Sequence, residues 1–407
     1  MQRSTKAKQN PIMKYFAMTI LTVLLVSIEI YAQLKKEPYR FSADIENKIQ
    51  QDTLPWKYQI GAAEFSISGH FRKALDAWDK NGSGIPKLSS EDSLYFKSFY
   101  PQPAADYIIS RCGNEQVIII NEAHHNPMHR AFTESLLQGL YSKGYRFLGL
   151  EALFDSVINK RRFATTESGY YTQEPQMANL IREAIRIGFT VFGYEASQGK
   201  NGKEREIEQA KNIAVVMSKN PDSKFLIHCG YDHVIEGTPP TKSWEKAMAG
   251  RLKEYTGINP FTIDQVKYSE KGDPKFNHPY IKLAESEFPS VMVNLKGQLF
   301  NGKKDNDQID CAIIHPTTKY LHGKPDWLSI SGLRREFVIP DSLINQLPVL
   351  IFAYRKNEFG NNGIPADIAE IESKGQSVPL LLEKGEYKII MKNKEYNTVS
   401  EFDHKIE

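Results

Sequence analysis

Short apolar runs alternate with helix-like segments through the middle of this 407-residue chain. The runs are rich in β-branched and aromatic residues, which predicts buried strands at residues 117–120, 146–150, 189–194 and 224–227. The segments between them repeat apolar residues every three to four positions, which predicts helices at residues 127–142, 176–187 and 203–218. This β-α-β-α-β-α-β order favours a parallel sheet with helical crossovers.

The pattern is weaker on both sides of this region. Residues 33–55 are polar and are predicted to form a loose lead-in. Helical spacing returns at 65–78 and again at 95–112, where Pro101 and Pro103 break it near the start. Further along, a helix is expected at residues 244–255, and strands are expected at residues 261–266, 290–295 and 310–314.

The chain changes character from about residue 330. Strand-like runs separated by turn sequences occur at residues 335–339, 348–354, 378–382 and 387–392. We therefore expect an α/β protein that has a mostly parallel sheet with helices on both faces, plus a small C-terminal β-rich module. The expected divisions are a signal peptide at 1–32, a lead-in and helical segment at 33–88, an α/β domain at 89–328 and the β-rich module at 329–407.

The first 32 residues have the character of a signal peptide. Lysines precede an apolar run from Tyr15 to Ile28, and Ala32 offers a small-residue cleavage position before Gln33. An uncleaved N-terminal anchor is the alternative, although Glu29 interrupts the run and about 20 apolar residues are needed to span a bilayer. We expect an exported protein, periplasmic or secreted, without a membrane span in its mature chain.

Charge and cysteine content narrow the functional classes. The formal net charge is only +3 and no basic stripe is present, so nucleic acid is not an expected partner. Cys112, Cys229 and Cys311 all lie near predicted strands and form no Cys-x-x-Cys pair, which favours buried thiols over a thiolate zinc site. The expected partner is instead a small-molecule or peptide substrate, and no oligomeric state is indicated.

The most informative feature is the residue that follows each predicted strand. Glu122, Glu151, Glu195 and His228 come after the four strands in turn. A single glutamate after a strand is usually the first polar residue of a loop. Four in succession favour a shared site, because the carboxyl ends of parallel strands meet at one edge of the sheet, where open α/β sheets bind ligands.

The loop after the first strand adds histidines to this edge. Asn126-Pro127 is typical of a helix start, so His124, His125 and His129 lie close to the positive end of a helix dipole. That position disfavours imidazolium, and a neutral histidine can act as a base or a ligand. His129 could equally be a helix-surface residue. His124 and His125 point in opposite directions in an extended segment, so one of the two is expected to be structural.

The loop after the fourth strand offers a second group of candidates. Asp232 could orient His228 or His233, as carboxylates commonly orient functional imidazoles. Arg205, near the start of the helix that follows Glu195, could clamp an anionic group, or could simply be part of a solvated helix start.

Two cofactors suit these residue types. A divalent metal such as Mn or Zn could be held by nitrogen and oxygen ligands from His124, His233, Glu122 and Glu195. Haem iron could be ligated by the histidines or by one of the tyrosines Tyr170, Tyr171 and Tyr231. The sequence has no Gly-x-Ser-x-Gly elbow, phosphate loop, dinucleotide fingerprint or His-Glu-x-x-His, so the expected chemistry depends on glutamate and histidine.

Residues 90–265 resemble the superfamily that joins erythromycin esterases, ChaN-type haem-binding proteins and the Tiki/TraB proteins. Glu122-Ala123-x-His125 is similar to the Gly-Glu-Ala-Thr-His of the esterases, and Arg205 with the helix after it is similar to their arginine segment. Glu122-x-His124-x-Asn126-Pro127 is similar to the ChaN branch. Asn121-x-x-His124 and Gly230-x-x-His233 resemble the paired Gly-x-x-His motifs of the Tiki branch, except that Asn121 replaces the glycine.

The resemblance implies an exported hydrolase of ester or amide bonds. His124 or His125 would act as the general base, with Glu122 and Glu195 tuning or orienting it and Arg205 with His228 or His233 holding the developing oxyanion. Glu151 is a further catalytic candidate. The metal-dependent chemistry of one branch and the haem binding of another, in which Tyr231 would bind the cofactor, are the alternatives that the resemblance leaves open.

Overall fold

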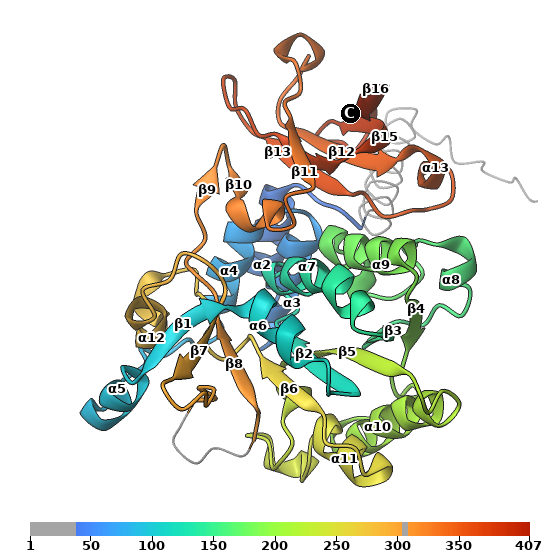
Figure 1. Cartoon of the computed structure of the whole chain (residues 1–407). Helices are drawn as coiled ribbons and strands as arrows, with labels where there is room; N and C mark the ends of the chain where they lie inside the picture. Colours follow the sequence, from blue (N-terminus) through green and yellow to red (C-terminus); the bar gives the residue numbers. More distant parts are fainter. Residues whose placement is uncertain (1–37, 303–307) are drawn as a thin grey trace, which may run out of the picture.

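A computed structural model describes residues 38–302 and 308–407, and the predicted signal peptide lies outside these residues. An eight-stranded sheet with the order β1-β7-β8-β6-β2-β5-β3-β4 forms the centre of the molecule (Figure 1). Its six strands from β8 to β4 run parallel, whereas β7 pairs antiparallel with β8 on one side and with the edge strand β1 on the other. The strands are β1 (Phe99–Pro103), β2 (Val117–Glu122), β3 (Tyr145–Leu150), β4 (Thr190–Gly193), β5 (Lys224–Gly230), β6 (Phe261–Asp264), β7 (Ser290–Asn294) and β8 (Cys311–Ile314).

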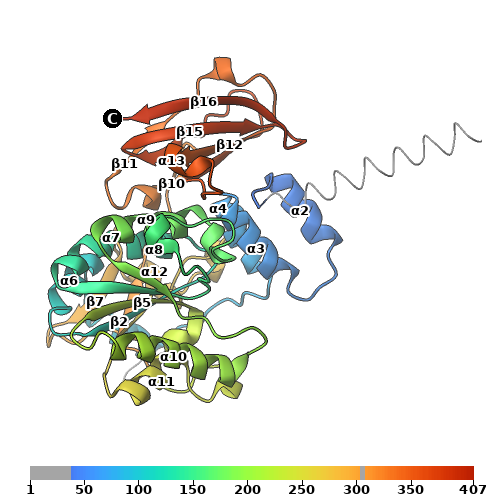
Figure 2. The ribbon, with the colours of Figure 1, turned by 90° about the vertical axis from the view of Figure 1, so that its right-hand side faces the viewer.

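Helices cover both faces of this sheet, as expected. The view in Figure 2 has α6–α9 above the sheet and α10 and α11 below it. The helices of the domain are α6 (Ala104–Arg111), α7 (Met128–Ser142), α8 (Ile158–Arg161), α9 (Pro175–Ile187), α10 (Gly202–Ser218), α11 (Met248–Thr256) and α12 (Pro279–Leu283). No described helix is long and apolar enough to cross a membrane.

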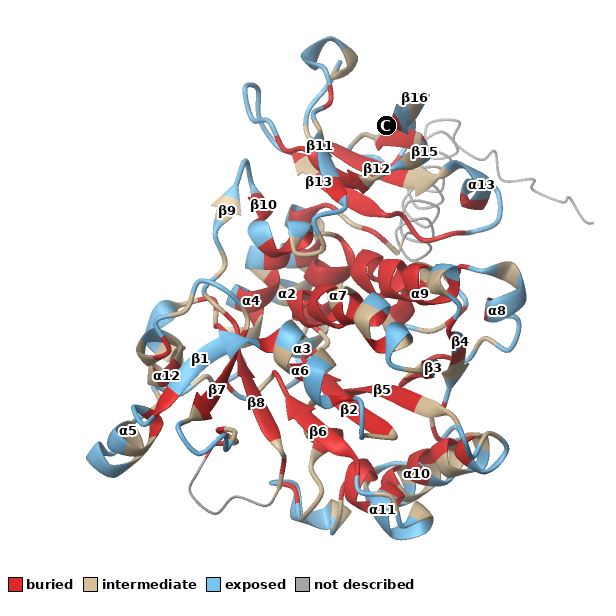
Figure 3. Cartoon of the chain, in the orientation of Figure 1, coloured by how far each residue is buried: buried red, intermediate tan, exposed pale blue. Residues whose placement is uncertain are grey.

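Strand β2 shows how the sheet is buried from both sides (Figure 3). Ile118 and Ile120 join the core beneath α7 and α9, whereas Val117 and Ile119 join the core beneath α10 and α11. Successive side chains of a strand point to opposite faces, so a continuous apolar run is the pattern of a strand covered on both sides.

The N-terminal part contains more helix than the sequence predicts. Residues 33–55 were expected to be loose, but they contain α2 (Ser42–Gln51), and two helices, α3 (Lys57–Ile67) and α4 (Phe71–Asp79), replace the single helix expected at 65–78. Helix α2 is anchored by tertiary contacts, with Ile45 buried and the Ser42 backbone donating to Glu370. Such docking stabilises a short helix that local propensity alone does not predict.

The segment at 95–112 was also expected to be mostly helical. It forms the end of α5 (Ser90–Phe96), then strand β1 and helix α6. Pro101 and Pro103 lie in β1, which pairs only with β7 at the border of the sheet. Proline has no N–H to donate and is therefore tolerated on an edge strand.

The C-terminal residues form the expected β-rich module. It comprises β9 (Tyr320–Leu321), β10 (Lys324–Pro325), β11 (Arg334–Phe337), β12 (Val349–Arg355), α13 (Lys356–Phe359), β13 (Asp367–Ile371), β14 (Leu380–Glu383), β15 (Gly385–Lys392) and β16 (Thr398–Ile406). Its four-stranded sheet lies above α7 and α9 (Figure 2). Leu350, Phe352 and Ile368 share one apolar core with Leu180 and Ile181 of α9, so the module covers this helical layer.

Candidate functional site

The predicted polar residues do gather at one edge of the sheet. Glu122 is the last residue of β2, Glu151 directly follows β3, and Glu195 follows β4 after one further residue. Strand β5 was expected to end at Ile227 but continues to Gly230, where it still pairs with Glu122 of β2. His228 therefore lies inside a strand, not in a loop, and its ring is buried.

The parity of the strand positions sends these residues to opposite faces. Ile120 and Leu150 both point toward α7, so Glu122, two residues after the first, shares the α7 face, whereas Glu151, one residue after the second, lies on the α10 face. Each carboxylate meets an arginine from the helix on its side: Arg130 on α7 and Arg205 on α10.

The first cluster is centred on Arg130, which is fully buried. Its Nε and Nη2 donate to the two oxygens of Glu122 at 2.5 and 2.6 Å, and its Nη1 donates to Glu174 at 3.0 Å. Although burial alone would raise the pKa of Glu122, the Arg130 charge and its hydrogen bonds hold that pKa well below the usual range. Glu174 also caps α9 by accepting from the Met177 N–H, which ties the cluster to a second helix.

Two histidines bind to the same Glu122 carboxylate. His228 Nε2 lies 2.9 Å from Glu122 Oε2, and its Nδ1 lies 3.3 Å from the Thr133 hydroxyl, so this ring is enclosed beneath α7. His124 Nδ1 lies 2.8 Å from Glu122 Oε1. A carboxylate can only accept, so Nδ1 of His124 carries a proton, and in the neutral imidazole the lone pair is on Nε2.

The second cluster is centred on Arg205. It donates to Glu195 from Nε at 2.9 Å and from Nη2 at 2.7 Å, and it also pairs with Glu151. Burial alone would raise the pKa of Glu151, but the charges of His233 and Arg205 and the Gly230 N–H bring it down to about 2. The Arg205 side chain keeps 27% of its surface exposed, in contrast to Arg130.

His233 completes the second cluster on its buried side. Its Nδ1 lies 2.8 Å from Glu206 and its Nε2 accepts from Arg205 at 2.9 Å, while the ring stacks on Trp244. Burial disfavours its charged form, but Glu151 and Glu206 raise its pKa above the ordinary value. Both ring nitrogens of His233 form hydrogen bonds within the protein, so His233 fixes the position of Arg205.

Gly230 brings the two clusters together. A Cβ atom on this residue would lie 2.4 Å from Cε1 and 2.6 Å from Nε2 of His124, and 3.2 Å from Oε2 of Glu151. Only a residue without a side chain leaves room for the His124 ring edge against the β5 backbone. His124 is therefore held by Glu122 from one cluster while its Nε2 edge lies next to Glu151 of the other.

His124 and His125 lie in a turn, not in the extended segment that the sequence predicts, and both line the same cavity. Each of the two rings stacks on a different aromatic side chain, and His125 lies beside α4. Its ring stacks on Trp78 with centroids 4.0 Å apart, and its Nδ1 lies 3.2 Å from the Tyr231 hydroxyl. Burial lowers the pKa of His125 well below its usual value. Tyr231 adopts the left-handed backbone region, with φ of 41°, which a non-glycine residue adopts only under strain from its surroundings.

A cavity of about 460 Å³ lies directly over His124. Helices α3 and α4 and the segment before α9 form its walls, which are lined by Gln59, Ile60, Ala63, Glu64, Trp78, His124, His125, Tyr170, Tyr171 and Tyr231. His124 stacks on Tyr171 at 3.8 Å and is partly exposed. Among the described residues, no hydrogen-bond partner of His124 Nε2 is found, so this nitrogen is accessible to a ligand in the cavity.

The four residues predicted as metal ligands do not form one coordination set. His124 belongs to the Glu122 cluster, and His233 and Glu195 belong to the Arg205 cluster. Both carboxylates are already neutralised by guanidinium groups, and the His233 nitrogens are occupied. Within residues 38–302 and 308–407, no group of three or more His, Cys, Asp or Glu side chains is arranged to hold a metal ion.

Several residues of the site were not predicted from the sequence. Arg130, Glu174, Thr133, Glu206 and Trp78 all contact predicted residues. Arg130 carried a usable signal, since it follows the Asn126-Pro127 start closely and is the only lysine or arginine in α7. Glu174-Pro175 is likewise a recognisable helix start. Trp78 gave no signal, because only the tertiary fold brings α4 to this edge.

His129, which the sequence left as either a site or a surface residue, is neither. It is fully buried, and its Nδ1 accepts from the Ala123 N–H at 2.9 Å, so it braces the loop that carries His124. Asp232 does not contact His228 or His233 by any hydrogen bond found among the described residues.

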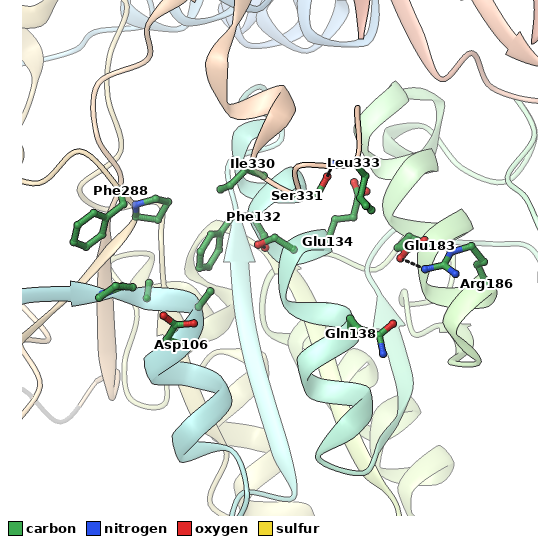
Figure 4. A pocket seen from close by; sticks show the side chains of 15 residues that line it. Asp106, Phe132, Glu134, Gln138, Glu183, Arg186, Phe288, Ile330, Ser331 and Leu333 are labelled. Carbon is green, nitrogen blue, oxygen red and sulfur yellow. Dashed lines mark hydrogen bonds and ion pairs between the residues drawn. The ribbon is translucent and has the colours of Figure 1, made fainter. Parts of the chain in front are cut away.

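A second cavity, of about 530 Å³, lies on the outer side of α7 (Figure 4). Phe132, Phe288, Ile330 and Leu333 contribute apolar walls, and none of the predicted site residues lines it. Glu134 extends from α7 toward it and pairs with the buried Arg334 at 3.1 Å, so this carboxylate joins α7 to the β-rich module. The cavity over His124 is therefore the one that joins predicted residues to accessible space.

The site thus belongs to an α/β protein that gathers Glu, His and Arg side chains at the carboxyl ends of parallel strands. No protein-family model matches the chain, and no curated protein matches its sequence. Among solved structures, the chain is similar to RRSP, a MARTX toxin effector domain from Vibrio vulnificus CMCP6, with 16% identity and a TM-score of 0.30 over 63% of this chain and 48% of that one. A structure described as bacterial protein toxins matches with 14% identity and a TM-score of 0.29 over 61% of this chain and 47% of that one. The chain spans about half the length of each of these structures.

Proposed function

We propose that the protein hydrolyses an ester or amide bond and that His124 is the general base. The observation that carries this proposal is the Glu122–His124 pair: the 2.8 Å contact at Nδ1 leaves the Nε2 lone pair directed to the cavity. A carboxylate that fixes the tautomer and orientation of an imidazole is the arrangement by which histidine removes a proton from an attacking group. The resemblance of this loop to the esterase and Tiki families supports the same reaction class.

The reaction assigns a role to each cluster. His124 Nε2 takes a proton from water, the resulting hydroxide adds to the carbonyl carbon, and the bond to the alcohol or amine breaks as the imidazolium returns its proton to the leaving group. Arg205 pairs with Glu151, which lies beside the His124 ring edge at Gly230, and its partly exposed guanidinium would stabilise the developing oxyanion. His228 and His233, which were the other candidates for that role, are buried and act through Glu122 and Arg205. No step of this scheme uses a metal.

The test compares the purified protein with His124→Ala and with a His124→Ala/His125→Ala double variant on a panel of p-nitrophenyl esters and amides. Hydrolysis should be lost in both. A matched control is His322→Asn, because His322 is exposed, lies far from the site in sequence and has a positive φ that asparagine tolerates. Unchanged rates in the double variant would overturn the proposal.

Haem binding is a second candidate, and one observation favours it. The accessible Nε2 of His124 lines a cavity with aromatic walls, and histidine is a common axial ligand of haem iron. Tyr231 is less suited, because burial raises its pKa well above the usual value and its hydroxyl is occupied by His125. Titration with haemin should give a Soret band that disappears in His124→Ala, and no spectral change would remove this candidate.

Export also belongs to the proposal. It depends on residues 1–32, which lie outside the described part of the chain. Expression of the full chain in a bacterial host with a periplasm should yield a mature protein that begins at Gln33, as N-terminal sequencing would show. A retained N-terminus in the membrane fraction would support an uncleaved anchor instead.

A further inference from the structure

The cavity over His124 has the composition of a receptor for organic cations. We infer that it binds a substituted ammonium group and that the substrate carries such a group next to the bond that is cleaved. The statement about the bond depends on the proposed hydrolase function, whereas the statement about ammonium binding does not. Four features support ammonium binding. The cavity has aromatic walls and an acidic residue in one wall, carboxylates are in excess beneath it, and no cation is among its described lining residues.

Aromatic rings make up much of the wall. Trp78, Tyr170, Tyr171 and Tyr231 all line the cavity, and their positions are mutually fixed. Trp78 stacks on both His125 and Tyr231, and Tyr171 stacks on His124 and meets Tyr170 edge-on with centroids 5.2 Å apart. Aromatic rings held in this way bind quaternary and substituted ammonium groups through their negative faces.

Glu64 of α3 provides a negative charge at the same wall. Its Oε1 pairs with Lys48, whose side chain is 40% exposed, while its Oε2 has no hydrogen-bond partner among the described residues. The charge reaches the rings, because the pKa of Tyr170 is raised first by burial and then by Glu64. A ligand ammonium in the cavity would therefore meet a carboxylate as well as ring faces.

The clusters beneath the cavity add to this negative potential. Glu122, Glu174, Glu151, Glu195 and Glu206 belong to these clusters, together with the two guanidinium groups of Arg130 and Arg205. No lysine or arginine is among the residues that line the cavity. Carboxylates that outnumber cations at the base of a partly enclosed site attract a positively charged ligand.

A pair of ligands that differ only in charge tests the inference without any turnover. Choline and 3,3-dimethylbutan-1-ol have the same shape, with a nitrogen in one where the other has carbon. Isothermal titration of the full protein should show that choline binds at least tenfold more tightly. Equal affinity for the two compounds, or tighter binding of the neutral alcohol, would overturn the inference.

Variants show whether the preference arises in this cavity. Trp78→Leu, Tyr171→Leu and Glu64→Gln should each reduce the ratio of choline to alcohol affinity by at least fivefold. Tyr100→Leu is the control, because Tyr100 is an exposed aromatic residue on edge strand β1, and it should leave the ratio unchanged. A ratio that stays constant in all three cavity variants would place the preference elsewhere and overturn the inference; one folded aromatic variant is sufficient for the test.

Ester kinetics separate this inference from the proposed function. Choline esters and 3,3-dimethylbutyl esters with the same acyl group should differ at least tenfold in kcat/KM, mainly through KM. Hydrolysis of both esters at equal rates would leave the hydrolase intact and overturn the ammonium site. Choline binding without hydrolysis of any ester would retain the ammonium site and overturn the hydrolase.

Discussion

The two arginine-centred clusters contain similar groups but differ in their burial. Arg130 bridges Glu122 and Glu174 with none of its side chain exposed, whereas Arg205 bridges Glu151 and Glu195 with 27% exposed. Arg130 belongs to the α7 and α9 layer, which the β-rich module covers, whereas Arg205 belongs to α10 on the opposite face of the sheet (Figure 2). One ion cluster therefore holds His124 from inside the protein, while the other keeps its guanidinium partly exposed.

The largest effect on catalysis is expected for substitution of His124, which contacts Glu122 of one cluster and lies next to Glu151 of the other. His124→Ala should lower kcat/KM by about 10²- to 10⁴-fold, because general-base catalysis contributes a factor of that order. His125→Ala should leave kcat closer to that of the wild type and act mainly on KM, since His125 orders Trp78 and Tyr231 in the wall. Steady-state kinetics on one ester decide the matter. Equal losses of kcat in the two variants would contradict the assignment of His124 as the general base and of His125 as part of the cavity wall.

The arginines themselves should separate stability from activity. Arg130→Met leaves Glu122 and Glu174 buried without the guanidinium that neutralises them, and breaking a buried ion pair in this way costs about 3–5 kcal/mol of unfolding free energy. Arg205→Met should cost less stability, because the Arg205 side chain is already 27% exposed in the folded protein, but should reduce kcat strongly through the loss of oxyanion stabilisation.

Denaturant unfolding at pH 7 and ester kinetics on both variants provide the comparison. If Arg130→Met and Arg205→Met lowered the unfolding free energy equally, the deeper burial of Arg130 would not make its cluster more important for stability.

The sequence predicts one part of this site well and another part poorly. Runs of apolar residues followed by Glu122, Glu151 and Glu195 place these carboxylates at one sheet edge, because parallel strands share their direction. The alternation of side chains along β2 and β3 would also have separated Glu122 from Glu151 onto opposite faces. Trp78 and Tyr171 could not be predicted. The local sequences of α4 and of the segment before α9 do not indicate that these segments pack against the His124 loop.

Parts of the fold escaped prediction for related reasons. Strand β16 alternates exposed charged residues such as Glu401, Asp403 and Lys405, so it shows little apolar periodicity and is defined by pairing with β15. The last residues of β5 look like a loop because Gly230 follows Cys229, yet pairing with β2 extends the strand and buries His228. Contacts distant in sequence, not local propensity, determine these elements.

The Glu151 cluster should show its stabilising role in the pH dependence of unfolding. The folded-state pKa of Glu151 is about 2, below its ordinary value of 4.5, so the unfolded chain binds more protons between these values. Its contribution is then fully present above pH 4.5 and is lost as the pH falls toward 2.

The difference in unfolding free energy between the wild type and Glu151→Gln should be constant from pH 8 to 5, on the order of 2 kcal/mol. It should shrink in urea titrations at pH 4 and 3.5. A difference that is independent of pH down to 3.5 would show that the Glu151 carboxylate is not preferentially ionised in the folded state.

Gly230→Ala should affect the contact between the clusters more than either cluster itself. The added methyl would meet the His124 ring at 2.4 Å, so the ring must shift away from β5 and from Glu151. We expect a loss of kcat of about 10-fold or more, since small displacements of a base are costly, with a smaller change in stability. Gly113→Ala is a matched control, because a Cβ there has no neighbour within 4 Å. Unchanged kcat in Gly230→Ala would show that the tight position of His124 is not required.

The smallest effect is expected at Tyr231, which lines the cavity over His124. Tyr231→Phe removes the hydroxyl that bonds His125 and keeps the ring that stacks near Trp78, so unfolding free energy should fall by only about 1 kcal/mol. Tyr231→Asn keeps the left-handed backbone but removes the ring, and it should raise KM for the choline ester several-fold while Tyr231→Phe does not. Thermal melts and KM values for both variants test this difference. If Tyr231→Phe raised KM as much as Tyr231→Asn, the hydroxyl group and its hydrogen bond to His125 would be the features of Tyr231 that matter for binding. The contribution expected from the ring face would then be wrong.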